Sequence, residues 1–313
     1  METIRYTDEY KETWNELVRG SRNGTFLIDR NYMDYHKDRF TDCSLLFKDK
    51  NRTIGVLPAN LTENDRTVYS HQGLTYGGLI LDKNATALQV MEMMDEAVKY
   101  FGTQLKAKKF IYKPIPAIFH NYPSQEDLYY LFIHNAKLRT RKLSCTIRQD
   151  NPLPFAYSRT TGLHKAVRNG LTMQHTDDPR QFWEVLEHVL QAYHNAKPVH
   201  NVEEIVQLMK KFPEEMQLYT ALHEGNTVAG ILIYNTPLVA HTQYIASNED
   251  GRNCCALDFL MEELVHNVFK DKQYFDFGTS NSNNGHNLET GLLFQKESFG
   301  GRGITYDEWE ILI

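Results

Sequence analysis

Long apolar runs are absent from this 313-residue sequence, and residues 1–20 carry no charged-then-apolar leader. A spanning helix needs about 20 consecutive apolar residues, so we expect no membrane span and a cytoplasmic protein. Cysteine is also scarce. The four cysteines, at positions 43, 145, 254 and 255, fit neither a disulfide framework nor zinc-ligand spacing. We therefore expect inert thiols and no metal site.

Acidic residues exceed basic ones, giving a net charge of −6, but the basic residues are unevenly placed. Between Lys137 and Arg168 there are eight basic residues and a single acidic one, Asp150. Such a segment in an acidic protein indicates a site for a phosphate, a nucleotide or a nucleic-acid backbone. A solvated charged strand and linker would show the same pattern.

The composition, 41% hydrophobic and 24% charged, is typical of a globular protein. The length suits two domains of about 150 residues each. Pro152 and Pro154 disfavour both a helix and a central strand. We therefore predict an N-terminal domain over 1–152 and a C-terminal domain over 153–313.

The two halves repeat one order of predicted elements. In the second half, helices over 178–196 and 201–212 precede a hairpin, a strand over 239–246, a helix and a strand at Phe275. The hairpin strand Thr53–Leu57 aligns with Val228–Leu232, and His71 and His241 are predicted to lie on corresponding strands. Internal duplication explains this most economically.

The stretch from Phe275 to Arg302 begins as a short apolar strand and breaks at Gly278 into a loop of serine and asparagine. It then recovers into a segment with Lys296 and Phe299 ahead of Gly300. Open α/β sheets place ligands where strands run into such loops. An ordinary connection between a strand and a helix is the alternative.

Two motifs in this stretch resemble a known family. Phe275-Asp276-Phe277-Gly278, followed by Lys296-Glu297-Ser298-Phe299-Gly300, is similar to the aspartate-phenylalanine-glycine and lysine-x-x-phenylalanine-glycine pair of Fem-type peptidyltransferases, relatives of the GNAT acyltransferases. The resemblance covers most of residues 160–302; the first half matches by element order. It implies an α/β (α+β) fold of two tandem GNAT-like domains, each a mixed, mostly antiparallel sheet flanked by helices.

Two departures from the family pattern concern the donor. The GNAT pyrophosphate loop is reduced to Gly251-Arg252-Asn253 ahead of a helix, which bears on coenzyme A binding. The helices over 178–196 and 201–212 are shorter than the helical hairpin of the enzymes that use aminoacyl-tRNA. The second departure weighs against tRNA as a partner.

Three residues are candidates for catalysis: His241, Lys296 and Tyr244. Acyl transfer to an amine needs a proton acceptor, and histidine exchanges protons near neutral pH. Strand alternation would put His241 and Gln243 on one face and Tyr244 on the other. The resemblance implies that Lys296 stabilises negative charge. A hydrogen-bonded core histidine and a solvent-facing lysine are the alternatives.

Two groups of residues are candidates for binding. Free backbone N–H groups of Gly251, Arg252 and Asn253, with the Arg252 side chain, would hold a phosphate of the donor. The candidate substrate-binding residues are His71, Gln72, Tyr76, Gln243, Asp276, Gly278, Ser280, Asn281 and Phe299. The segment from His71 to Gly78 is expected on the acceptor side of a cleft between the domains. Asp276 has an alternative role, capping the loop through backbone N–H groups.

These observations predict an acyltransferase that moves an acyl or aminoacyl group to an amine or hydroxyl of an envelope or sugar-nucleotide precursor. No permanently bound cofactor is expected; acetyl-CoA or another acyl-CoA is the favoured co-substrate. One alternative is a non-catalytic GNAT-like binding protein. Another is an aminoacyl-tRNA-dependent peptidyltransferase that holds tRNA through the basic segment. The sequence leaves the oligomeric state open.

Overall fold

The computed structural model describes residues 1–313, except for the side chain of His194. The chain forms two compact units. Unit 1 comprises residues 1–142, 281–287 and 305–313, and unit 2 comprises residues 143–280 and 288–304. The chain enters unit 2 within strand β9 (Lys137–Arg148), ahead of the predicted boundary at residue 152. None of the described helices is long and apolar enough to cross a membrane.

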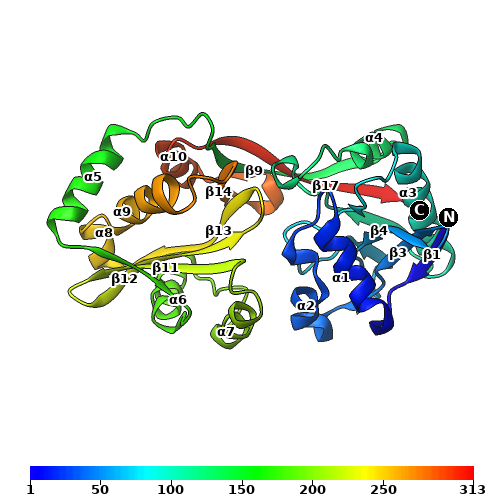
Figure 1. Ribbon diagram of the computed structural model, residues 1–313, viewed down its shortest axis with the longest axis horizontal. Coiled ribbons are helices and arrows are strands. Elements are labelled where there is room, and N and C mark those ends of the chain that lie inside the picture. The colour runs from blue at the N-terminus through cyan, green and yellow to red at the C-terminus, as the bar shows by residue number, and fades with distance from the viewer. The chain divides into compact units, whose positions relative to one another are not determined.

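Unit 1 has two sets of strands and four α-helices (Figure 1). The first set has the order β1-β3-β4-β7, and the second runs β17-β8-β6-β5-β2. The bounds are β1 (Glu2–Arg5), β2 (Thr41–Asp42), β3 (Leu45–Asp49), β4 (Arg52–Leu57), β5 (Asn60–Thr62), β6 (Thr67–Tyr69), β7 (Ile80–Leu81), β8 (Lys109–Tyr112), β17 (Arg302–Leu312), α1 (Lys11–Gly20), α2 (Arg30–Met33), α3 (Ala87–Thr103) and α4 (Glu126–Ile133).

Helix α3 shows how the sequence builds the core of unit 1. Thr86 and Gln89 form a reciprocal capping box that satisfies backbone donors at the start of the helix. Val90, Met94 and Phe101 recur at helical spacing and are fully buried against the strands. This methionine-containing stripe is core packing.

The glycine-rich segment after β6 is a loop, so the predicted correspondence between His71 and His241 is wrong. His71 follows β6 with a φ of 61°, a left-handed conformation that a strand does not accommodate. Gly77 explains part of the loop's shape, because a Cβ there would lie 2.0 Å from the Ser70 carbonyl oxygen. The hairpin of β3 and β4 does have the predicted counterpart in the second half, the hairpin of Met216–His223 and Asn226–Asn235.

Unit 2 has one sheet in the order β10-β11-β12-β13-β14-β9. Its strands pair antiparallel, except that β13 and β14 are parallel. The bounds are β10 (Thr172–Thr176), β11 (Met216–His223), β12 (Asn226–Asn235), β13 (Val239–Ser247) and β14 (Tyr274–Thr279). A small hairpin of β15 (Asn281–Ser282) and β16 (Asn287–Leu288) follows β14 in the chain, and its residues 281–287 belong to unit 1. The predicted mixed, mostly antiparallel sheet is confirmed.

Helices cover both faces of this sheet (Figure 1). Helices α5 and α9 lie on one face, and α6 and α7 on the other. The bounds are α5 (Tyr157–Arg168), α6 (Arg180–His194), α7 (Val202–Lys211), α8 (Glu249–Asn253), α9 (Ala256–Glu263) and α10 (Thr290–Ser298). Asn201 and Glu204 form the capping box expected at the start of α7. Gly230 allows the ring of Phe182 to pack directly on β12, because a Cβ would lie 2.3 Å from that ring.

Candidate functional site

The sheet of unit 2 opens between its two parallel strands. β13 and β14 pair over three positions, and the last pair is His241 with Asp276. Beyond this pair β13 continues to Ser247 against β12, while β14 continues to Thr279 against β9. The two strands therefore diverge immediately after His241 and Asp276. Polar side chains at such a divergence point can reach a ligand held in the gap.

His241 and Asp276 form a hydrogen-bonded pair. The Nδ1 atom of His241 lies 2.6 Å from Oδ2 of Asp276. The other carboxylate oxygen, Oδ1, accepts hydrogen bonds from the Ser144 hydroxyl at 2.7 Å and the Thr146 hydroxyl at 2.6 Å. Asp276 is completely buried. It is therefore bound by three side chains, which differs from the loop cap considered from the sequence.

The surroundings of Asp276 favour its ionised form. Burial alone would raise the pKa of the carboxyl, but hydrogen bonds from His241, Thr146 and Ser144 outweigh it and hold the pKa below its ordinary value. An ionised carboxylate can only accept, so Nδ1 of His241 carries the hydrogen. The lone pair of the imidazole is then on Nε2. The His241 side chain keeps 13% of its surface exposed, so a substrate can approach it.

Lys296 and His241 both lie close to Gly278. The Lys296 ammonium donates to the carbonyl oxygens of Gly278 and Thr279, both at 2.8 Å. Gly278 has a φ of 71°, and a Cβ on it would lie 3.3 Å from Cε1 of His241. Burial lowers the pKa of Lys296 to about 8, partly offset by the charge of Asp276. Lys296 is thus buried, not solvent-facing.

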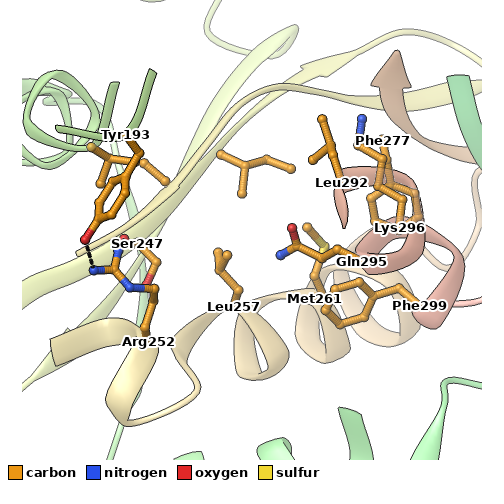
Figure 2. A pocket seen from close by; sticks show the side chains of 13 residues that line it. Tyr193, Ser247, Arg252, Leu257, Met261, Phe277, Leu292, Gln295, Lys296 and Phe299 are labelled. Atoms are coloured by element: carbon orange, nitrogen blue, oxygen red, sulfur yellow. Dashed lines mark hydrogen bonds between the residues drawn. The ribbon is translucent and has the colours of Figure 1, made fainter. Parts of the chain in front are cut away.

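A cavity of about 370 Å³ occupies the gap between the strands (Figure 2). Tyr193 of α6 lines it from one face of the sheet, and Leu257 and Met261 of α9 line it from the other. Lys296 of α10 and Phe299, which directly follows that helix, form one end. The cavity therefore passes through the sheet, with an apolar middle portion suited to an extended ligand.

Arg252 lies at the opposite end of the cavity from Lys296 (Figure 2). Its guanidinium donates to the Ser247 carbonyl at 2.9 Å and to the Tyr193 hydroxyl at 2.7 Å. Among the described residues, those that line the cavity include Arg252 and Lys296 but no carboxylate. The charge of the lining therefore favours a ligand that carries negative charge.

The backbone N–H of Gly251 is already used, contrary to the sequence argument for a phosphate-binding loop. Gly251, Arg252 and Asn253 lie inside α8, and the Gly251 N–H donates to the side chain of Asn248 at 2.9 Å. The glycine is needed for packing, because a Cβ would lie 2.3 Å from the Val228 carbonyl oxygen. Any binding of an anion here would depend on the Arg252 side chain.

Tyr244 shares a face with His241, contrary to the predicted alternation. Tyr244 pairs with Leu232 and Thr242 pairs with Ile233, so Gln243 is an extra residue in a β-bulge. The bulge shifts every later side chain of β13 to the opposite face from the one that strict alternation gives.

The Tyr244 hydroxyl is part of the packing against α6. It lies 2.8 Å from Nδ1 of His200, and its ring packs edge-on against Trp183 with centroids 5.1 Å apart. Burial raises the pKa of the hydroxyl, so it stays protonated at neutral pH. Tyr244 therefore lies on the same face of the sheet as His241, and its side chain is held in place by His200 and Trp183.

Four of the candidate substrate-binding residues belong to unit 1. His71 is buried beside the rings of His36 and Phe40, and burial holds its pKa well below the ordinary value. The Tyr76 hydroxyl lies 3.1 Å from that of Thr25. The other two are Gln72, which accepts a hydrogen bond from Asn60, and Asn281, which donates to backbone carbonyls of its own hairpin. Their role with the acceptor stays a prediction.

Ser280 and Phe299 belong to unit 2 and are buried. The Ser280 backbone N–H donates to the Leu143 carbonyl and so fixes the end of β14. The guanidinium of Arg159 lies 4.4 Å from the centre of the Phe299 ring and also pairs with Asp258. Phe299 is thereby held as a wall of the cavity.

The basic segment is dispersed along β9 and α5. Four of its eight basic side chains, those of Arg141, Lys142, Arg148 and Arg159, form ion pairs with carboxylates. Partnered charges attract a polyanion less strongly than free ones. This arrangement favours the charged-strand interpretation of the segment over a binding site.

Sequence reasoning missed Ser144, Thr146 and Tyr193. Ser144 and Thr146 are separated from Asp276 by more than a hundred residues and precede the predicted domain boundary. The sequence feature that could have indicated them is the alternation of hydroxyl-bearing and apolar side chains along this strand. That pattern shows a polar face but does not say which residue it contacts.

Sequence comparison with protein-family models and with curated proteins found no match. Comparison of structures found several. FemX superposes with a TM-score of 0.71 at 11% identity, covering 100% of this chain and 98% of that one. The C-terminal domain of a putative lysylphosphatidylglycerol synthetase from Agrobacterium fabrum gives 0.61 at 11% identity, covering 96% and 91%.

An acetyltransferase of the GNAT family from Colwellia psychrerythraea also matches, with a TM-score of 0.54 at 10% identity and complete coverage of both chains. Identities this low show the fold and nothing more. The chain has a GNAT-like fold related to that of FemX, and the resemblance predicted from the sequence is confirmed at the level of the fold.

Proposed function

We propose that this protein transfers an acyl or aminoacyl group from an activated donor to an amine or hydroxyl, with His241 as the general base. The observation that carries the proposal is the hydrogen-bonded His241–Asp276 pair at the point where β13 and β14 diverge. Among the described residues Lys296 and Arg252 line the cavity and His241 does not, so the cavity is proposed to hold the donor and His241 to meet the acceptor. The likeness of the fold to a GNAT-family acetyltransferase and to FemX supports it.

In the proposed reaction, the acceptor nitrogen or oxygen attacks the carbonyl carbon of the donor. Nε2 of His241 takes the proton that the acceptor loses, while Asp276 holds the imidazole in position and stabilises its charge. The new C–N or C–O bond forms, and the bond to the donor's leaving group breaks. The leaving thiolate or alkoxide then takes up a proton from water, and the imidazolium of His241 returns its proton to water, which restores the neutral base.

Lys296 and Arg252 have separate roles in this proposal. The Lys296 ammonium donates to the Gly278 carbonyl, and Gly278 also lies close to Cε1 of His241, so the charge of Lys296 is proposed to stabilise the oxyanion that develops on the substrate carbonyl. Arg252 binds a phosphate of the donor at the other end of the cavity. An extended donor with an anionic end and an apolar middle, such as acyl-coenzyme A, fits this lining best.

The acceptor is proposed to be an envelope or sugar-nucleotide precursor in the cytoplasm. This part rests on the likeness to FemX and to the lysylphosphatidylglycerol synthetase domain. An aminoacyl ester is the second candidate donor, also because of those likenesses. Helices α6 and α7 are as short as the sequence indicated, so acyl-coenzyme A remains the favoured donor.

A thermal-shift titration with coenzyme A and acetyl-coenzyme A tests the donor. A ligand at 100 times its dissociation constant adds about 2.7 kcal/mol to the stability, which is a shift of several degrees. Arg252→Ala should abolish the shift, whereas Arg168→Ala, an exposed arginine on α5, should leave it unchanged. No shift with the wild-type protein would exclude coenzyme A as donor and leave the aminoacyl ester or a non-catalytic binding protein.

A further inference from the structure

The carboxylate of Asp276 is held by a strand that precedes the rest of unit 2 in the sequence. Ser144 and Thr146 are both on β9, and both hydroxyls donate to the same oxygen, Oδ1, at 2.7 and 2.6 Å. The second oxygen, Oδ2, is thereby left for His241. The two ends of the carboxylate are thus assigned to different partners.

The sheet register explains how two hydroxyls reach one oxygen. Thr146 pairs directly with Asp276, whereas Ser144 pairs with Thr279. A register irregularity lies between these two pairs, at Phe277 and Gly278 of β14. In a regular ladder Ser144 would face Gly278, two residues beyond Asp276. Ser144 and Thr146 are two residues apart on β9 and so point to the same face of the sheet, which lets both hydroxyls reach the carboxylate of Asp276.

We infer that Ser144 and Thr146 are positioning residues for the reaction of the proposed function. They act through Asp276 and not on the substrate. By binding Oδ1 they fix the orientation of the carboxylate, so that Oδ2 faces Nδ1 of His241 and the Nε2 lone pair is available. They also stabilise the negative charge of a carboxylate that has no exposed surface.

Loss of the Ser144 and Thr146 hydroxyls should change the protonation of the His241–Asp276 pair in a definite direction. The charged or titratable side chains that act on Asp276 are His241 of β13, Lys296 of α10 and Cys145 of β9. Hydrogen bonds from Ser144 and Thr146 favour the unprotonated His241–Asp276 pair, because they compensate its negative charge. Without them the pair takes up a proton at higher pH. The acid limb of the pH profile should therefore move to higher pH.

The sequence supplies matched variants. Thr146→Val keeps the shape and removes the hydroxyl, while Thr146→Ser keeps the hydroxyl and removes a methyl group. Thr242→Val on β13 is the control. Thr242 is buried next to His241 in the chain, and within the described part of the structure its hydroxyl has no hydrogen-bond partner. A loss caused merely by removing a buried hydroxyl would appear in Thr242→Val as well.

Transfer kinetics over a range of pH test the inference. Thr146→Val and Ser144→Ala should each lower kcat/KM roughly ten-fold and move the acid limb up by about one pH unit. Thr146→Ser should restore most of the activity and the original profile. Thr242→Val should match the wild type. An unshifted acid limb in both Thr146→Val and Ser144→Ala would overturn the inference, as would an equal loss in Thr242→Val.

A measurement without substrate separates this inference from the proposed function. The imidazole signals of His241 can be assigned by comparison with His241→Gln and followed by NMR over the same pH range. Thr146→Val should move the midpoint of that titration to higher pH by about one unit, and Thr242→Val should not. If the midpoint moves and no donor is turned over, the proposed function fails and the positioning of the pair stands. If it does not move, the positioning role is wrong.

Discussion

The imidazole of His241 has one nitrogen bound to a buried carboxylate and the other free for proton transfer. Asp276→Asn tests this arrangement with little change in shape. The amide nitrogen of asparagine would donate to Nδ1 and force the hydrogen onto Nε2, the wrong tautomer for a base. We expect kcat to fall on the order of 10³-fold or more. Thermal unfolding of the variant should show that it still folds; a folded variant with wild-type kcat would contradict the role of Asp276.

A second prediction at this scale concerns Lys296. Burial lowers its pKa from an ordinary 10.5 to about 8, so between those values the unfolded chain binds more protons than the folded one. Stability of the wild type should therefore rise, by roughly 3 kcal/mol at most, as pH increases from about 8 to about 10.5. Lys296→Met should lose this rise.

Urea unfolding of both proteins at pH 7 and near pH 10 measures the Lys296 effect. Methionine keeps most of the aliphatic packing of the side chain, and that packing does not change with pH, so the difference in pH dependence between the two proteins isolates the ammonium group. Lys99→Met, a change at an exposed lysine of α3, controls for general effects of alkaline pH. Parallel pH dependence in wild type and Lys296→Met would show that the ammonium is not held in a desolvated site.

Some residues of the candidate site could be predicted from the sequence, and others could not. The sequence singled out Gly278 and Lys296 together, and in the structure the Lys296 ammonium donates to the Gly278 carbonyl. The partners of Asp276 could not be predicted, because Ser144 and Thr146 reach it through long-range pairing. Neither the local propensity nor the spacing of residues contains that information.

At the scale of elements, the packing of α8 against β12 and β13 depends on a glycine. A Cβ at Gly251 would lie 2.3 Å from the Val228 carbonyl and 2.4 Å from the Ser247 hydroxyl. Gly251→Ala should therefore lower the free energy of unfolding by about 1–3 kcal/mol. Gly291→Ala in α10 has no atom within 4 Å of the new Cβ and should gain roughly 0.5–1 kcal/mol. Urea denaturation compares them; equal effects would contradict this packing.

Elements with clear periodicity were predictable, and those shaped by backbone exceptions were not. The amphipathic helix α7 and the hairpin of β3 and β4 formed where the pattern indicated. The bulge at Gln243 reversed the predicted face of Tyr244, and the left-handed conformation of His71 ended a predicted strand. Bulges and positive φ angles at non-glycine residues depend on tertiary contacts that periodicity does not record.

At the scale of the whole molecule, unit 2 includes residues that precede the boundary expected from the prolines. Strand β9 pairs with β14 and supplies Ser144 and Thr146 to Asp276. A fragment of residues 153–313 should therefore be less stable than one of residues 143–313, since it leaves β14 unpaired on one side and the buried carboxylate without two donors. Urea unfolding of the two fragments measures this; equal stability would show that β9 contributes little.

The fold class was predictable from the whole sequence because the order of elements and two short motifs pointed to one architecture. The assignment of residues to each of the two units was not predictable. Pro152 and Pro154 do interrupt regular structure, but they follow β9 and do not separate the two cores. A boundary read from local composition cannot recognise a strand that completes the sheet of the following unit.

The most direct test of the central claim is the rate of acyl transfer with and without His241. Release of coenzyme A thiol from acetyl-coenzyme A, in the presence of a panel of amine acceptors, should be measured for wild type and His241→Ala at pH 7.5 (about one unit above the ordinary pKa of an imidazole). We expect transfer by the wild type and a rate about 10²- to 10⁴-fold lower in a folded His241→Ala variant. Equal rates in the two proteins would contradict the assignment of His241 as the base.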